Sequence, residues 1–144
     1  MILRQATLTD AAPLAAVQQQ QPRAANWGEQ GFLGEIEQPC AIILCAEKEN
    51  KIVGFIAGRA AAGNAEILNF AVHPDCLRQG IGKALLDRML LELQQRAIQQ
   101  VSLEVAQDNL AACALYEKMG FTRWNVRKDF YGAGCDALIL GKKL

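Results

Sequence analysis

The residues best suited to chemistry in this sequence form a glycine-containing loop, Arg78-Gln79-Gly80-Ile81-Gly82-Lys83. Apolar residues then recur every three or four positions and predict a helix from Ile81 to about Arg96. The first turn of a helix has backbone N–H groups without intrahelical acceptors, and the helix dipole adds about half a positive charge there. Such a loop can cradle the phosphate oxygens of a ligand.

Three phosphate ligands compete for this loop. A P-loop requires Ser or Thr after the Gly-Lys pair, whereas Ala84 follows Gly82-Lys83 here. A dinucleotide fingerprint requires a third Gly or an Ala at position 85, which is Leu. The third candidate is the pyrophosphate of coenzyme A. The loop alone does not distinguish these ligands from a helix that simply begins with glycines.

A second chemical candidate is Glu104, in the predicted strand Val101–Ala106. Strand alternation places Glu104 on the face opposite to Val101, Leu103 and Val105. A carboxylate in a largely buried sheet is costly unless it is paired or faces water. Glu104 therefore has a charged partner, lines a cleft or serves the function, and the strand pattern leaves all three open.

The order of predicted elements indicates one α/β domain over residues 1–144, with a mixed sheet of about seven strands and helices on both faces. The helix after the glycine loop should be a right-handed crossover between two parallel strands. We expect Thr9 or Asp10 to cap the first helix. The predicted strands are Ile2–Ala6, Cys40–Glu47, Ile52–Arg59, Glu66–Val72, Val101–Ala106, Phe121–Lys128 and Ala137–Leu140; the other predicted helices end near Gln20, Glu37 and Met119.

Composition excludes several classes of protein. Hydrophobic residues make up 51% of the 144, which is enough for a core, and 15 basic against 15 acidic residues argue against a general nucleic-acid binder. The N-terminus does not resemble a secretory signal, and the longest apolar run, Cys40–Ala46, is too short to span a membrane. The five cysteines are scattered and there is one histidine, so we expect a cytoplasmic protein with reduced thiols and no metal site.

Residues 66–140 contain an ordered set of short motifs: Ala71-Val72-His73-Pro74, Gly80-x-Gly82, Leu103-Glu104-Val105, the pattern N-x-x-A-x-x-L-Y-x-x-x-G-F from Asn109 to Phe121, Arg127–Tyr131 and Asp136-Ala137. This set resembles the GNAT N-acetyltransferases, and in particular the RimI-type branch that acetylates ribosomal-protein alanine N-termini. One position departs from the family pattern, because Leu77 stands where Gln or Arg is usual.

The resemblance implies a GNAT-like, mostly antiparallel sheet with about four helices and a splayed parallel strand pair in its middle. It also implies acetyl-CoA as cosubstrate. Glu104 would be the general base, acting through water, and Tyr116 the general acid. The residues implied to contact the cosubstrate are Phe70, Ala71 and Val72 for the pantetheine arm, Arg78, Gln79, Gly80, Ile81, Gly82 and Lys83 for the pyrophosphate, and Asn109 at the next helix start.

The expected reaction is direct transfer of the acetyl group to an amine in a ternary complex, since no Cys or Ser with an adjacent base is evident. The expected partner is a protein or peptide N-terminus, possibly from a ribosomal protein, with no nucleic acid or membrane, and the chain should be a monomer or weak dimer. Trp27–Glu37 and Arg127–Tyr131 should line the acceptor groove, although Trp27 could equally be buried under the sheet edge.

Other interpretations stay open at this stage. Tyr116 could be a core aromatic residue, and Asn109 a plain helix cap. The acceptor could be a lysine or a small-molecule amine. The chain could also bind acetyl-CoA without catalysis, or bind a nucleotide through the same loop.

Overall fold

The computed structural model describes all residues from Met1 to Leu144. The chain forms seven strands and four α-helices, with short 3₁₀ turns at Leu8–Asp10 and Pro74–Cys76. No helix is both long and apolar enough to cross a bilayer. The elements are β1 (Ile2–Gln5), α1 (Ala11–Gln19), α2 (Gly28–Ile36), β2 (Ala41–Lys48), β3 (Lys51–Ala61), β4 (Asn64–Val72), α3 (Ile81–Gln95), β5 (Gln100–Ala106), α4 (Leu110–Lys118), β6 (Thr122–Arg127) and β7 (Ala137–Lys143).

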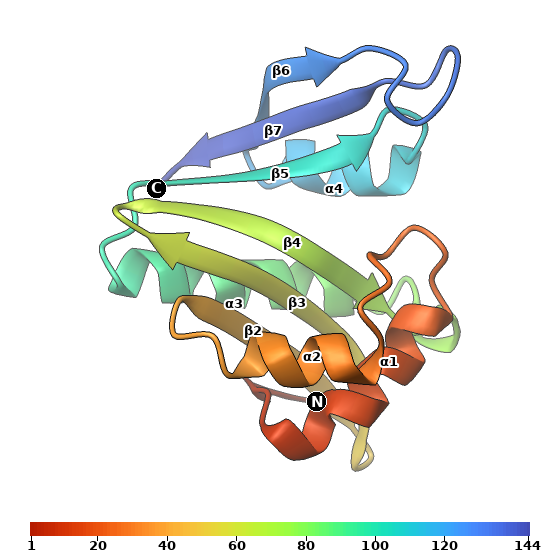
Figure 1. The fold of residues 1–144 in the computed structure, drawn as a ribbon, viewed down its shortest axis with the longest axis vertical. Coiled ribbons are helices and arrows are strands. Elements are labelled where there is room, and N and C mark those ends of the chain that lie inside the picture. Colours follow the sequence, from red (N-terminus) through yellow and green to blue (C-terminus); the bar gives the residue numbers. More distant parts are fainter.

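All seven strands form one sheet in the order β1-β2-β3-β4-β5-β7-β6 (Figure 1). Only β4 and β5 are parallel, and α3 is the crossover between them. The predicted mixed and mostly antiparallel sheet is therefore confirmed. Some predicted strand ends were wrong. β7 continues to Lys143 instead of stopping at Leu140, because its last residues pair with the start of β5. β3 ends at Ala61 instead of Arg59 and β4 begins at Asn64 instead of Glu66, because these added residues pair with one another.

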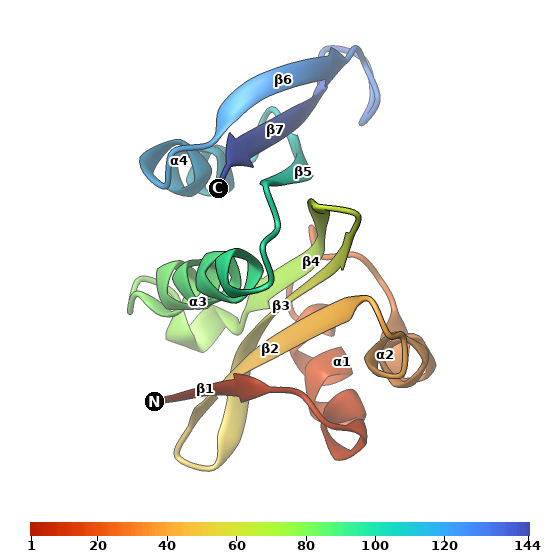
Figure 2. The ribbon, with the colours of Figure 1, turned by 90° about the vertical axis from the view of Figure 1, so that its left-hand side faces the viewer.

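Helices cover both faces of the sheet, as predicted. Helices α1 and α2 lie on one face, and α3 and α4 on the other (Figure 2). Each face has its own apolar core, one built around Leu14, Phe32 and Phe55 and a larger one around Leu85 and Met89. Burial of these side chains is the main force that holds the two layers to the sheet.

The two halves of the sheet separate in the middle. Parallel pairing of β4 with β5 begins at Asn64 opposite Gln100 and ends at Ile67 opposite Leu103. Beyond this point the strands diverge, as Figure 1 shows by the gap that widens between them. The expected splayed pair is thus present.

A β-bulge lies where the separation begins. On β3, Ala57 pairs with Asn69 and Gly58 pairs with Ile67, so Leu68 is an extra residue in β4. A bulge bends its strand and increases the local twist. Gly58 is needed here, since a Cβ at this position would lie 2.8 Å from the Glu66 carbonyl oxygen.

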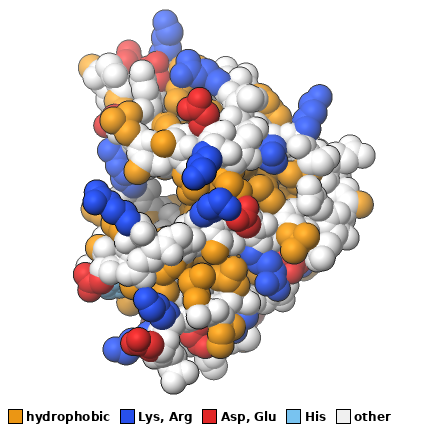
Figure 3. Space-filling view, turned by 180° about the vertical axis from the view of Figure 1, so that it is seen from behind, with side chains coloured by type: hydrophobic (Ala, Val, Ile, Leu, Met, Phe, Trp, Pro, Cys, Tyr) orange, Lys and Arg blue, Asp and Glu red, His pale blue; other side chains and the backbone are white.

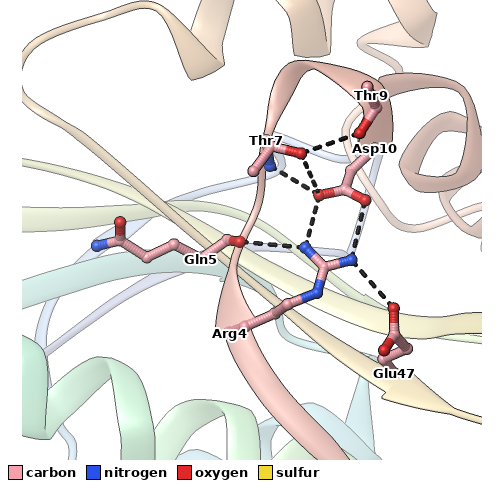
Figure 4. Close-up of polar contacts among 6 residues, drawn as sticks. All are labelled: Arg4, Gln5, Thr7, Thr9, Asp10 and Glu47. Atoms are coloured by element: carbon pink, nitrogen blue, oxygen red, sulfur yellow. Dashed lines mark hydrogen bonds and ion pairs between the residues drawn. The ribbon is translucent and has the colours of Figure 1, made fainter. Parts of the chain in front are cut away.

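The entry to α1 is held by a partly buried ion pair (Figure 4). Arg4 donates to both carboxylate oxygens of Asp10 at 2.8 and 3.0 Å and also contacts Glu47 at 3.1 Å. Asp10 in turn accepts the Thr7 N–H at 2.7 Å. Neither Thr9 nor Asp10 caps α1 through its side chain, because the Asp10 carboxylate turns back to Arg4 and closes the preceding turn.

We predict that Asp10→Asn lowers the free energy of unfolding at pH 7 by about 1–2 kcal/mol, since charged hydrogen bonds to a buried group are lost. The Arg4 guanidinium holds the pKa of Asp10 below its ordinary value of about 3.9. The stabilisation is therefore complete above about pH 4 and declines as the pH falls further. Urea unfolding at pH 7 and pH 3 measures both effects.

The matched control is Asp87→Asn, which breaks an exposed helical pair with Lys83 and should change stability by less than about 0.5 kcal/mol. An equal loss for Asp10→Asn at both pH values would contradict this role of the carboxylate.

Candidate active site

A groove of about 530 Å³ lies between the end of β4, the loop before α3 and one side of α4. Figure 3 shows the molecule from this side, with Lys and Arg side chains around a hollow between its upper and lower parts. Nine of the ten residues expected to contact the cosubstrate line the groove: Phe70, Ala71, Val72, Arg78, Gly80, Ile81, Gly82, Lys83 and Asn109.

Backbone amides form the polar end of this groove. No backbone N–H from Arg78 to Lys83 donates to an acceptor within the protein, which leaves six successive donors. Arg78 and Gly80 adopt left-handed backbone angles, with φ of 63° and 80°, and this geometry turns the loop into the first turn of α3. Successive amides at a helix start suit a diphosphate.

Two positions near the loop are exceptions: Gln79 does not make the expected contact, and Leu77 departs from the family pattern. The Gln79 side chain does not line the groove and instead accepts a hydrogen bond from Lys48 at 3.0 Å. Leu77 lines the groove with a half-exposed apolar side chain. The phosphate cradle thus relies on backbone N–H groups and on the nearby cations of Arg78 and Lys83.

A slot of about 100 Å³ continues from the groove into the gap between the splayed strands. Glu104 of β5 and Tyr116 of α4 both line this slot. Tyr116 lies between the rings of Phe70 and Phe121, at centroid distances of 6.4 and 5.6 Å. It therefore packs in the core, as one interpretation held, while its ring also faces the slot.

The electrostatic setting of Tyr116 favours its protonated form. Its side chain is 7% exposed, and burial raises the pKa of the phenol well above its ordinary value of about 10. The hydroxyl makes no hydrogen bond within the protein. A neutral phenol that faces a cavity can donate its proton there.

A third cavity, of about 390 Å³, lies on the other side of Glu104. Its walls come from the α1–α2 connection, the end of β5 and the β6–β7 connection, and its lining residues are Pro22, Arg23, Glu104, Val105, Ala106, Asp108, Tyr131 and Cys135. The groove and the slot share Tyr116, and the slot and this third cavity share Glu104, so the three cavities adjoin one another where the sheet is splayed.

Glu104 has the polar partners that its strand position requires. Its side chain is 28% exposed, its Oε2 accepts a hydrogen bond from the Tyr131 hydroxyl at 3.2 Å, and its Oε1 lies 3.5 Å from the Arg127 guanidinium. The Arg127 guanidinium also lies over the Phe130 ring. The expected Arg127–Tyr131 segment thus reaches Glu104, and its Tyr131 lines the third cavity.

The other expected acceptor wall is not where the sequence suggested. None of residues 27–37 lines the three cavities. Trp27 packs on Phe32 with ring centroids 5.2 Å apart, and this contact holds α2 on the core. The preceding residues, Pro22 to Ala25, line the cavities instead.

Asn109 serves as a helix cap and also lies in the groove. Its Oδ1 accepts the Ala112 N–H at 3.4 Å at the start of α4. Its side chain amide has no other partner within the protein, so its N–H groups are free to meet a ligand.

The pattern of the acetyltransferase (GNAT) family matches residues 6–121. The chain belongs to the GNAT family. It is 33% identical over 119 residues to the [ribosomal protein bS18]-alanine N-acetyltransferase of Escherichia coli K12, a match that covers 83% of this chain and 80% of that protein. The crystal structure of the Escherichia coli ribosomal-protein-S18-alanine N-acetyltransferase superposes with a TM-score of 0.88 at 29% identity, over 99% of this chain and 92% of the other.

A further GNAT structure, the PaiA N-acetyltransferase of Thermoplasma acidophilum in complex with coenzyme A, has a TM-score of 0.83 at 22% identity and covers 99% of this chain and 98% of its own. At this identity the likeness shows the shared fold alone. GNAT membership makes this chain an acetyltransferase by family.

Proposed function

We propose that this GNAT protein transfers the acetyl group of acetyl-CoA to the N-terminal amine of a protein, with an alanine-starting ribosomal protein as acceptor. The observation that carries the proposal is the shared slot. Glu104 and Tyr116, from two different elements, line one narrow slot between a groove with an amide cradle and the third cavity, which we call the acceptor cavity.

The groove has the chemistry that coenzyme A requires. Its six free amide donors and the cations of Arg78 and Lys83 suit the diphosphate. Because β5 has diverged, the edge of β4 from Leu68 onward has no strand partner and is open to the pantetheine arm. The bound cosubstrate would supply an activated thioester, whose thiol is a good leaving group.

The two site side chains divide the proton transfers. Glu104 accepts a proton from the acceptor amine, through one water molecule, on the acceptor side of the slot. Tyr116 is protonated and donates to the departing thiolate on the groove side. The amine attacks the acetyl carbonyl directly, so the C–N bond forms and the C–S bond breaks within one ternary complex.

The modest strength of this base favours an N-terminal acceptor. An α-amine has a pKa of about 7.7–8.0, whereas a lysine amine has about 10.4. At pH 7 roughly a tenth to a fifth of N-termini carry the free amine, against less than about 0.1% of lysines. A carboxylate acting through water is sufficient for the first acceptor. The names of the bacterial relatives, bS18-alanine N-acetyltransferases, point to the same class.

The five cysteines are all free thiols, which suits a reducing compartment. We infer that the protein acts in the cytoplasm, where ribosomal proteins are made and modified.

The acceptor class can be tested with peptides. A peptide that begins with Ala and contains one lysine should be acetylated on its α-amine at least about 100 times faster than on the lysine at pH 7, because of the difference in free amine. The matched control has the same sequence with a blocked N-terminus. Fragment-ion mass spectrometry locates the acetyl group.

Transfer to the lysine of the blocked peptide or to a polyamine would contradict the proposal. Binding of acetyl-CoA with no turnover on any amine would favour a non-catalytic module.

Tyr116→Phe should lower kcat by at least about ten-fold, since one general acid contributes about 10²–10⁴ in rate. Acetyl-CoA affinity and thermal stability should stay unchanged, because the hydroxyl makes no hydrogen bond within the protein. Release of free thiol measures kcat, and titration calorimetry measures affinity. Wild-type turnover in this variant would remove Tyr116 from the mechanism.

Glu104→Gln should lower the rate most strongly at low pH, where the acceptor amine is largely protonated. The ratio of wild-type to variant rate should shrink as the pH rises from 6.5 to about 9, where the α-amine is largely free. The measurement is the pH profile of kcat/KM for the alanine peptide. Parallel profiles for the two proteins would exclude a base role for this carboxylate.

A further inference from the structure

A buried amide on β4 fastens the connection between α1 and α2. Asn69 lies in the middle of β4 and is a polar residue that is only 4% exposed. Its Oδ1 accepts the Ala25 N–H at 3.2 Å, and its Nδ2 donates to the Ala25 carbonyl at 3.0 Å. A side chain that satisfies both polar groups of one residue acts as a clamp on that backbone.

The bulge decides that Asn69 faces this connection. Before the extra residue Leu68, Ala65 and Ile67 point into the core under α3. After it, Phe70 points to the α3 side, so Asn69 faces α1 and the α1–α2 connection. The clamp therefore lies on the part of β4 that β5 no longer accompanies.

Two further amide side chains hold the same connection. Gln21 donates to the Val72 carbonyl at 2.6 Å, and Gln18 accepts from the Trp27 and Gly28 N–H groups at 3.1 Å. These contacts secure the two ends, at residues 21 and 27–28. Between these ends, Gln18 also donates to the Asn26 Oδ1 at 3.3 Å, and Asn69 holds Ala25, two positions after Arg23.

Arg23 reaches from this connection to the other half of the sheet. It is the one residue that lines the groove, the slot and the acceptor cavity. Its guanidinium contacts the Asp108 carboxylate at 2.8 Å, 85 positions away in the sequence. In Figure 1 the connection rises beside the end of β4 toward the half that contains β5 and α4.

We propose that Asn69 is a positioning residue for the acceptor: by clamping Ala25 it holds Arg23 across the slot onto Asp108, and this bridge separates the acceptor cavity from the cosubstrate groove. The inference deepens the proposed function and rests on its assignment of the two cavities. An exposed ion pair is weak by itself, so the bridge depends on the clamp to keep one partner in place.

The bridge would form one wall of the acceptor cavity beside Glu104. Without it, the acceptor amine has a wider space and a less defined approach, whereas the amide cradle at Arg78–Lys83 is unaffected. The expected signature is a raised KM for the acceptor with little change in acetyl-CoA affinity or kcat.

The clamp itself can be tested without any substrate. Amide hydrogen exchange of the wild-type protein should show a protected Ala25 N–H, and Asn69→Ala should remove that protection. The matched control is Asn64→Ala at the start of β4, whose side chain contacts only the Ala62 carbonyl. An unprotected Ala25 N–H in the wild type would overturn the clamp.

Kinetics then test its consequence, with whichever amine the wild-type protein acetylates fastest. Asn69→Ala and Arg23→Gln should each raise the acceptor KM by about five- to ten-fold. The double variant should be no worse than either single one, because the two residues act through one bridge. Asn64→Ala should match the wild type.

Arg23→Gln is the decisive variant, because Arg23 is exposed and its replacement does not threaten folding if Asn69→Ala proves unstable. An unchanged acceptor KM in Arg23→Gln would overturn the proposal, as would additive effects in the double variant. If the fastest amine is a lysine or polyamine, the proposed acceptor class fails while these measurements still judge the bridge.

Discussion

The site of this protein depends on the break in hydrogen bonding between β4 and β5. Four residue pairs hold the parallel strands together, up to Ile67 and Leu103, and no pair follows. The extra residue Leu68 bends β4 at this point, and Gly58 on β3 permits the close approach that the bend requires. A continuous sheet would have had no groove, slot or acceptor cavity, because the strands themselves would have filled that space.

The polar groups around the opening of the sheet differ in whether they have partners within the protein. On the α1 side, the amide side chains of Gln21 and Asn69 join β4 to the α1–α2 connection. On the α3 side, the amides of Arg78 to Lys83 remain free. The first arrangement contributes to stability, and the second leaves donors for a ligand, as expected at a functional site.

The same division applies to the two side chains in the slot. Tyr116 is held by the rings of Phe70 and Phe121 with no polar partner, so its surroundings favour the neutral phenol. Glu104 is partly exposed and has Arg127 and Tyr131 beside it. The surroundings of the two side chains therefore differ, and the proposed mechanism gives them different roles, Tyr116 as the proton donor and Glu104 as the proton acceptor.

Local pattern was sufficient to predict much of this molecule. Strand alternation, helix periodicity and the turn residues indicated all seven strands and the four helices, and the motifs from Ala71 to Phe121 pointed to the GNAT family, which the matched family pattern confirms. They also singled out Glu104, Tyr116 and ten residues for the cosubstrate, nine of which line the groove. These features depend on residues that are close in sequence, so periodicity and motif spacing are sufficient to predict them.

Long-range pairing decided the rest. The alternation of apolar and polar residues around Leu68 predicts an unbroken strand. The bulge at Leu68 was not predictable, because it is defined by how β4 pairs with β3. Asn69, Arg23 and the Arg4–Asp10 pair had no motif to mark them, because their partners lie elsewhere in the fold. From the sequence, Trp27 was a candidate for the wall of the acceptor groove, but in the fold its ring packs on Phe32. The sequence by itself determined the elements and the reactive residue types, whereas only the tertiary structure decided where the sheet opens and which side chains close around the opening, because those contacts join residues that local spacing does not relate.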